Sequence, residues 1–197
     1  MMALGRHIRR FAVSRRATAA IEFAIIMPVL LILFLGSYDA GNAIAVYAKV
    51  RAATYSLAAI TNQYGDGTNP NYSPISTTTM TAITGAGAAI LAPYSSTPIT
   101  LVISQIKATS STAQTLSWSY SPTTGAALTA APTLPSNFAS NSCNSTYPCY
   151  FILASVSYSF TPMFGAFMTG PITLSDSLYT TPRVSKCVQY NGTPSSC

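Results

Sequence analysis

The chain has 197 residues, of which only 7% are charged, and its formal net charge is +6. Ordinary soluble proteins are about 25% charged, so a surface of hydroxyl and amide side chains is expected, as in an exported protein rather than a cytosolic enzyme. Five of the ten basic residues lie before residue 17, and the later part, with five basic and four acidic residues, is nearly neutral. This distribution argues against a nucleic-acid partner, which needs a basic stripe with interleaved aromatic side chains.

A hydrophobic segment follows the basic N-terminus. The apolar run 23–36 has 14 residues, and small residues back to Thr18 bring it close to the roughly 20 that a helix needs to cross a bilayer. Pro28 predicts a kink or a local unwinding, which a membrane helix tolerates. The preceding arginines predict a cytoplasmic N-terminus; they are Arg6, Arg9, Arg10, Arg15 and Arg16.

A single carboxylate, Glu22, lies at the start of the apolar run. A charge at this depth costs a few kcal/mol on insertion scales, so it points to a function. One interpretation is a signal anchor with Glu22 among the lipid headgroups. The other is a leader of the type IV pilin kind, in which a glutamate lies five residues after a peptidase cut.

The segment ATAAIEFAIIMPVLLILFLG (17–36), followed by Tyr-Asp-x-Gly at 38–41, resembles the TadE-like family of tight-adherence (Flp) pilus assembly proteins. That family has small residues, Glu-Phe, a proline-containing apolar helix and a polar helical continuation in this order. Residues 171–184 resemble its C-terminal strand, with Arg183 as the arginine near the end of that strand.

The resemblance implies that a prepilin peptidase cuts between Ala17 and Thr18. Glu22 is then the fifth mature residue, followed by Phe23, and would meet the new N-terminal amine of a neighbouring subunit. This chain has Ala17 where the usual pattern has glycine before the cut.

The implied role is that of a minor pilin or pseudopilin that initiates, caps or supports assembly of a pilus used in surface attachment. Its implied partners are the major pilin, other minor pilins, the peptidase and the inner-membrane assembly platform, in a hetero-oligomer. The implied location is the bacterial inner membrane, with a single pass, a periplasmic head and possible incorporation in a surface pilus.

The helix is expected to continue past the membrane. Apolar residues recur at spacings of three and four, which predicts a stripe that packs on a globular head; they are Val46, Val50, Ala53, Leu57 and Ile60. The cluster Gly-Asp-Gly at 65–67 is expected to end the helix near residues 63–65. The predicted parts are a leader (1–17), a membrane helix (18–36), an amphipathic continuation (37–64) and a head (65–197).

The head is predicted to be α+β. A second helix is expected over 76–91, with Ser76 as its N-cap, although Gly85 and Gly87 weaken this helix. Period-two alternation then predicts four half-buried strands with serine and threonine facing water; they cover 99–104, 116–120, 152–160 and 172–175. Together they form an antiparallel, pilin-like sheet.

Two connections of the head are also informative. Residues 122–148 are rich in Pro, Ser, Thr and Ala, which predicts a long loop. Residues 162–170, PMFGAFMTG, form an apolar loop. This loop could contact another subunit or the membrane, or it could fold into the head.

The four cysteines all follow the membrane segment, and an even number on the exported side predicts two disulfides. Of the three possible connectivities we favour Cys143–Cys149 and Cys187–Cys197, because each closes a short loop that holds a turn former. A zinc site is disfavoured, because the chain has no C-x-x-C spacing and its only histidine lies in the leader.

The sequence predicts a protein without enzymatic activity and without a cofactor. Its four acidic residues are spread along the chain, and no histidine after His7 could complete a catalytic triad. The alternative function is a secreted binding protein or adhesin. In that case the apolar run is a signal peptide that is cut near the small residues at 43–45.

Overall fold

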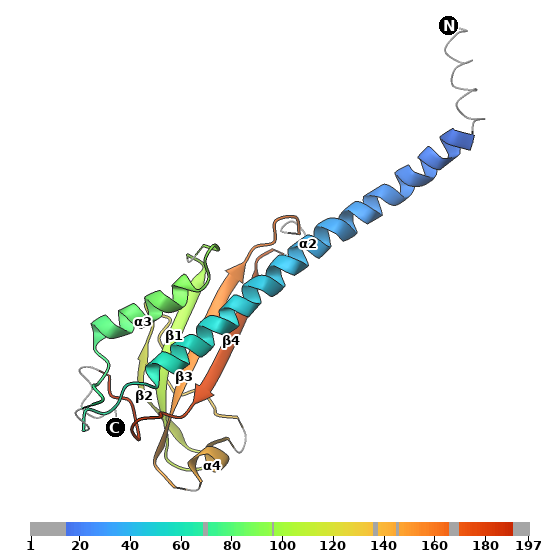
Figure 1. Ribbon diagram of the computed structural model, residues 1–197. Coiled ribbons are helices and arrows are strands. Elements are labelled where there is room, and N and C mark those ends of the chain that lie inside the picture. Colours follow the sequence, from blue (N-terminus) through green and yellow to red (C-terminus); the bar gives the residue numbers. More distant parts are fainter. Residues whose placement is uncertain are drawn as a thin grey trace, which may run out of the picture. The chain divides into compact units, whose positions relative to one another are not determined.

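The computed structural model describes residues 15–68, 71–95, 97–135, 138–144, 146–165 and 170–190 (Figure 1). Contacts divide the chain into two compact units. The first comprises Met1–Ala43 with Pro162–Gly170, and the second comprises Ile44–Thr161 with Pro171–Cys197. Both the α+β class and the order of the elements agree with the sequence-based expectation.

Helix α2 (Arg15–Thr61) begins three residues before the predicted start, runs through Pro28 without a break and ends close to the predicted stop. It is the one helix in the described part of the chain that is long and apolar enough to cross a membrane. In the second unit, the predicted stripe of α2 is buried from Val46 to Leu57, and Ile60 is half-buried.

The sheet of the second unit has four antiparallel strands in the order β2-β1-β3-β4. The strands are β1 (Ile99–Ala108), β2 (Gln114–Tyr120), β3 (Cys149–Phe160) and β4 (Ile172–Thr180). Helix α3 (Thr77–Ala89) is capped as predicted, because the Ser76 hydroxyl accepts the N–H of Thr79 at 3.1 Å. The C-terminal part of α2 and helix α3 cover one face of the sheet (Figure 1).

Gly87 explains how α3 approaches α2. A Cβ atom built at Gly87 would lie 2.8 Å from Cδ2 of Leu57, whereas one built at Gly85 would meet nothing within 4 Å. Gly87 therefore allows α3 to pack closely against α2. Although Gly87 lowers the helix propensity of α3, it improves the contact between the two helices.

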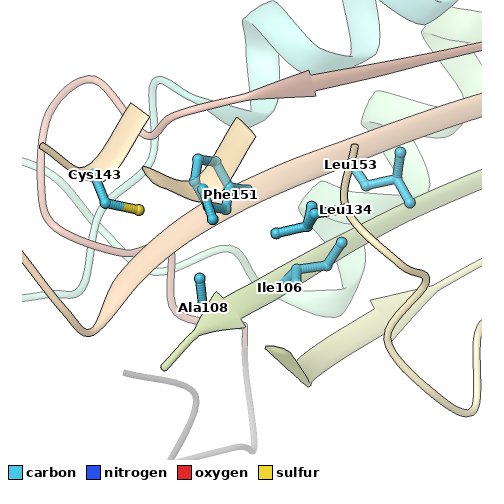
Figure 2. Packing of buried hydrophobic residues seen from close by; sticks show 7 residues of the cluster. Ile106, Ala108, Leu134, Cys143, Phe151 and Leu153 are labelled. Carbon is cyan, nitrogen blue, oxygen red and sulfur yellow. The ribbon is translucent and has the colours of Figure 1, made fainter. Parts of the chain in front are cut away.

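The prediction of half-buried strands holds for β4, where exposed and partly buried residues alternate, but it is wrong for the central strands β1 and β3, whose second face is also covered. Ile106, Phe151 and Leu153 pack in one cluster with Leu134 from the 122–148 connection (Figure 2). Ala139 of the same connection also belongs to this cluster. That connection is not wholly a loop, since it contains the short helix α4 (Phe138–Cys143).

Ser104 was expected to face water, and it is instead fully buried. Its hydroxyl lies 2.7 Å from that of Ser119, which in turn accepts the N–H of Leu128 at 2.8 Å. These two bonds satisfy the buried hydroxyl and attach the connection to the sheet.

Candidate functional site

The predicted processing residues lie at the start of α2. Ala17 and Thr18 fall in its first turn, and Glu22 and Phe23 follow one turn later. The side chains of Thr18, Glu22 and Phe23 are exposed. Within the described residues the Glu22 carboxylate has no hydrogen bond and no ion pair, so the structure brings it to no other predicted site residue.

The apolar surface around Glu22 has no partner in the first unit either. None of the apolar part of α2 that is suited to crossing a membrane is buried within the described structure. Large apolar side chains point outward all round the helix, with exposed fractions from 49 to 70%. A helix that is hydrophobic on every side needs lipid or other helices around it. These residues are Ile21, Phe23, Ile25, Ile26, Met27, Val29, Leu30, Leu31, Ile32, Leu33 and Phe34.

A second site, which the sequence did not predict as a contact, lies just after the apolar run. The Asp39 side chain is only 8% exposed and accepts three consecutive backbone N–H groups. Its Oδ1 accepts the N–H of Met163 at 3.0 Å, and its Oδ2 accepts those of Phe164 at 2.9 Å and Gly165 at 2.7 Å. Helix α2 thereby holds the first residues of the loop between β3 and β4.

The electrostatics of Asp39 favour its charged form. Burial of the carboxylate opposes ionisation, but the N–H donors of Gly165, Phe164 and Met163 outweigh that effect and hold the pKa of Asp39 below its usual value. Asp39 is therefore a carboxylate at neutral pH. Next to it, the rings of Tyr38 and Phe164 meet edge to face, with their centroids 5.8 Å apart.

The tip of this loop is apolar and exposed. Met163 is 72% exposed and Phe164 is 43% exposed, while Tyr38 is 51% exposed. The predicted apolar loop 162–170 is therefore described in part, and its residues 166–169 lie outside the described residues. The only sequence signals for this site were the Tyr-Asp pair after the apolar run and the apolar composition of the loop.

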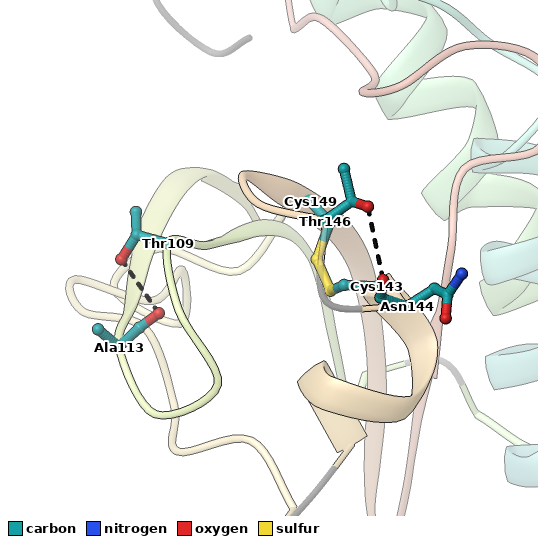
Figure 3. The surroundings of a disulfide bond; sticks show 6 residues. All are labelled: Thr109, Ala113, Cys143, Asn144, Thr146 and Cys149. Carbon is teal, nitrogen blue, oxygen red and sulfur yellow. Dashed lines mark hydrogen bonds between the residues drawn. A yellow bond between two sulfur atoms is a disulfide. The ribbon is translucent and has the colours of Figure 1, made fainter.

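The cysteines lie in the second unit. The predicted Cys143–Cys149 disulfide is present, with a Cα–Cα distance of 5.9 Å, and it joins the end of α4 to the start of β3 (Figure 3). Cys187 is buried, but Cys197 lies outside the described residues, so the Cys187–Cys197 bridge stays a prediction.

A cleft of about 520 Å³ lies beside the disulfide. Its walls include Asp66, Tyr147, Tyr150 and Lys186. Asp66 is already engaged, because the hydroxyl and the N–H of Thr68 donate to its Oδ1 at 2.7 and 3.0 Å and lower its pKa. In the described parts of the chain, no group of three or more His, Cys, Asp or Glu residues could hold a metal ion.

Comparison with known proteins agrees with the resemblance of the N-terminal segment. Residues 17–58 match the family model described as TadE-like protein. Comparisons with curated proteins and with solved structures gave no match. The match covers the apolar helix, Glu22 and Asp39, and it ends before the sheet begins. Through these residues the N-terminal part of the chain is similar to the TadE-like family, whose name connects it with the assembly of tight-adherence pili.

Proposed function

We propose that this protein is a minor pilin or pseudopilin that initiates, caps or supports assembly of a tight-adherence pilus used in surface attachment. One observation carries the proposal. The first unit exposes an apolar helix on all sides, and the single carboxylate of that helix, Glu22, has no partner within the described residues. Such a surface is suited to a bundle of similar helices or to a bilayer.

The chemistry at the start of the helix supports this role. A cut between Ala17 and Thr18 would create a new amine one helical turn before Glu22. In a medium of low dielectric constant, a carboxylate and an ammonium group attract each other much more strongly than in water. The amine of one subunit and Glu22 of its neighbour would therefore fix how far two helices are shifted along each other.

The direction of insertion follows from the arginines before the helix. They favour a cytoplasmic N-terminus and a periplasmic sheet unit. In this arrangement the prepilin peptidase and the assembly platform act from the inner membrane, and the major pilin and other minor pilins surround the helix. The exported side also suits the Cys143–Cys149 disulfide.

The proposal is tested first by the mature N-terminus of the protein from its native host, measured by mass spectrometry. A start at Thr18 is expected, and Ala17→Gly, which restores the usual residue before the cut, should be processed at least as well. An unprocessed N-terminus in both proteins would contradict the subunit role.

The second test is the piliation of two Glu22 variants. Glu22→Gln keeps the size of the side chain and Glu22→Ala does not, so an equal loss of piliation in both assigns the effect to the charge. Membrane levels of each variant serve as the control. Full piliation with either variant would contradict the proposed pairing with the amine.

The alternative is a secreted binding protein released by a cut near residues 43–45. The observation in its favour is that the second unit begins at Ile44. However, such a cut would remove Asp39 and leave three N–H groups of the β3–β4 loop without their acceptor. A soluble mature form that starts near Val46 would establish the alternative.

A further inference from the structure

We propose that residues 162–165, held by Asp39, form a second membrane contact that inserts Met163 and Phe164 at the boundary between lipid headgroups and acyl chains. The inference rests on the proposed function in one respect, namely that residues 18–36 span the membrane. It concerns a different segment, which lies more than 120 residues later in the sequence and belongs to the same compact unit.

The depth of the loop follows from helix geometry. Asp39 lies three residues after Gly36, where the apolar run ends, and a rise of 1.5 Å per residue places it about 4.5 Å further along the helix axis. A span of about 20 residues fills the hydrocarbon core, so Asp39 reaches the boundary where the core ends. The N–H groups bound to Asp39 lie at hydrogen-bond distance from it and hence at the same depth.

The side chains at this depth suit an interface. Tyr38, Met163 and Phe164 are all substantially exposed, and the Tyr38 ring packs on Phe164. Tyrosine is enriched where membrane and water meet, and exposed apolar side chains gain free energy by leaving water. The described part of the loop, 162–165, carries no charged side chain that would oppose insertion.

The backbone of the loop is prepared for a medium without water. Pro162 has no N–H group, and the next three N–H groups all donate to Asp39. An unpaired N–H costs several kcal/mol in lipid, so an unheld loop would resist insertion. Asp39 therefore acts as a positioning residue that removes this cost. Lipid is favoured over a protein partner because the contact continues directly from the membrane helix.

The test uses the full chain in phosphatidylethanolamine–phosphatidylglycerol vesicles that contain brominated lipids, which quench tryptophan. The wild type supplies the baseline, because its only tryptophan, Trp118, is 4% exposed in the other unit. The fluorescence that the new tryptophan of Phe164→Trp adds to this baseline should be quenched by the brominated lipids. Bromine near the headgroup end of the acyl chain should quench it more than bromine near the methyl end. Adding Asp39→Ala should reduce this loss.

Two further variants separate the possible failures. Leu31→Trp, within the span, should be quenched most by deep bromine, and Tyr55→Trp, an exposed position in the second unit, should not be quenched. Quenching at Leu31 without quenching at Phe164 overturns the loop inference and leaves the span intact. Quenching at neither position overturns the span as well. A blue-shifted but unquenched Phe164→Trp signal overturns the lipid assignment in favour of a protein contact.

Discussion

The contact between α3 and α2 makes a sharp prediction, because the chain offers two glycines in one helix with opposite surroundings. Gly85→Ala points into open space and should stabilise the fold by about 1 kcal/mol through helix propensity alone. Gly87→Ala gains the same propensity, but its new methyl group would lie 2.8 Å from Cδ2 and 3.1 Å from Cγ of Leu57.

The Leu57 side chain cannot easily move away from a methyl group at position 87. Its side chain is fully buried, so it cannot turn into solvent, and overpacking of this kind costs about 1–3 kcal/mol. Because the propensity term is common to both variants, the free energy of unfolding of Gly87→Ala should lie about 1–3 kcal/mol below that of Gly85→Ala. For a chain of this size, each kcal/mol corresponds to a shift in Tm of about 2–4 °C.

The assay is thermal and chemical unfolding of the full chain in a mild detergent, followed by near-ultraviolet circular dichroism. Leu57→Val in the Gly87→Ala background removes a methylene from the crowded position and should recover part of the loss. If Gly87→Ala stabilises the protein as much as Gly85→Ala does, the reasoning about close packing is refuted.

Three further predictions follow from single contacts. The pKa of Asp39 is lowered in the folded state, so its hydrogen bonds to the loop stabilise the fold fully at pH values above the ordinary pKa of about 3.9 and are lost as the pH falls through the lowered pKa of the folded state. Hydrogen exchange of the three amides should become faster over that pH range, and Asp39→Asn should abolish the pH dependence. Replacing both Cys143 and Cys149 by alanine should cost about 2 kcal/mol, since the bridge closes a short loop, and equilibrium unfolding with and without reductant measures this difference. Trp118→Phe removes a 2.8 Å hydrogen bond to the carbonyl of Val188 and should cost about 1–3 kcal/mol in the same assay, whereas no change would show that water replaces the lost donor.

Most of the fold could be predicted from local patterns in the sequence. The stripe from Val46 to Leu57, the cap at Ser76 and the Cys143–Cys149 bridge all depend on residues within a few positions of one another, so periodicity and spacing were sufficient. The strands were located by the same means, although the burial of the central strands β1 and β3 was underestimated.

What could not be predicted depends on distant segments. Gln105 is fully buried and accepts the N–H of Val188 at 2.6 Å, a bond across 83 residues that no local pattern indicates. Asp39 meets residues more than 120 positions away. Ser104 was placed on a water-facing side because nothing in its own strand shows that the 122–148 connection folds over it. In each case a polar residue is satisfied by a partner that only the tertiary structure supplies.

The Asp39 contact also has a mechanical consequence for the proposed pilus subunit, because assembly of a pilus would pull on its N-terminal helix. Tension applied to the membrane helix reaches the sheet unit through the backbone of α2, and it also reaches the β3–β4 connection through three parallel hydrogen bonds. The load is thereby divided between a covalent path and a releasable one. Under strong pulling the hydrogen bonds at Asp39 would break before any covalent bond, and the whole load would then pass through the backbone of α2.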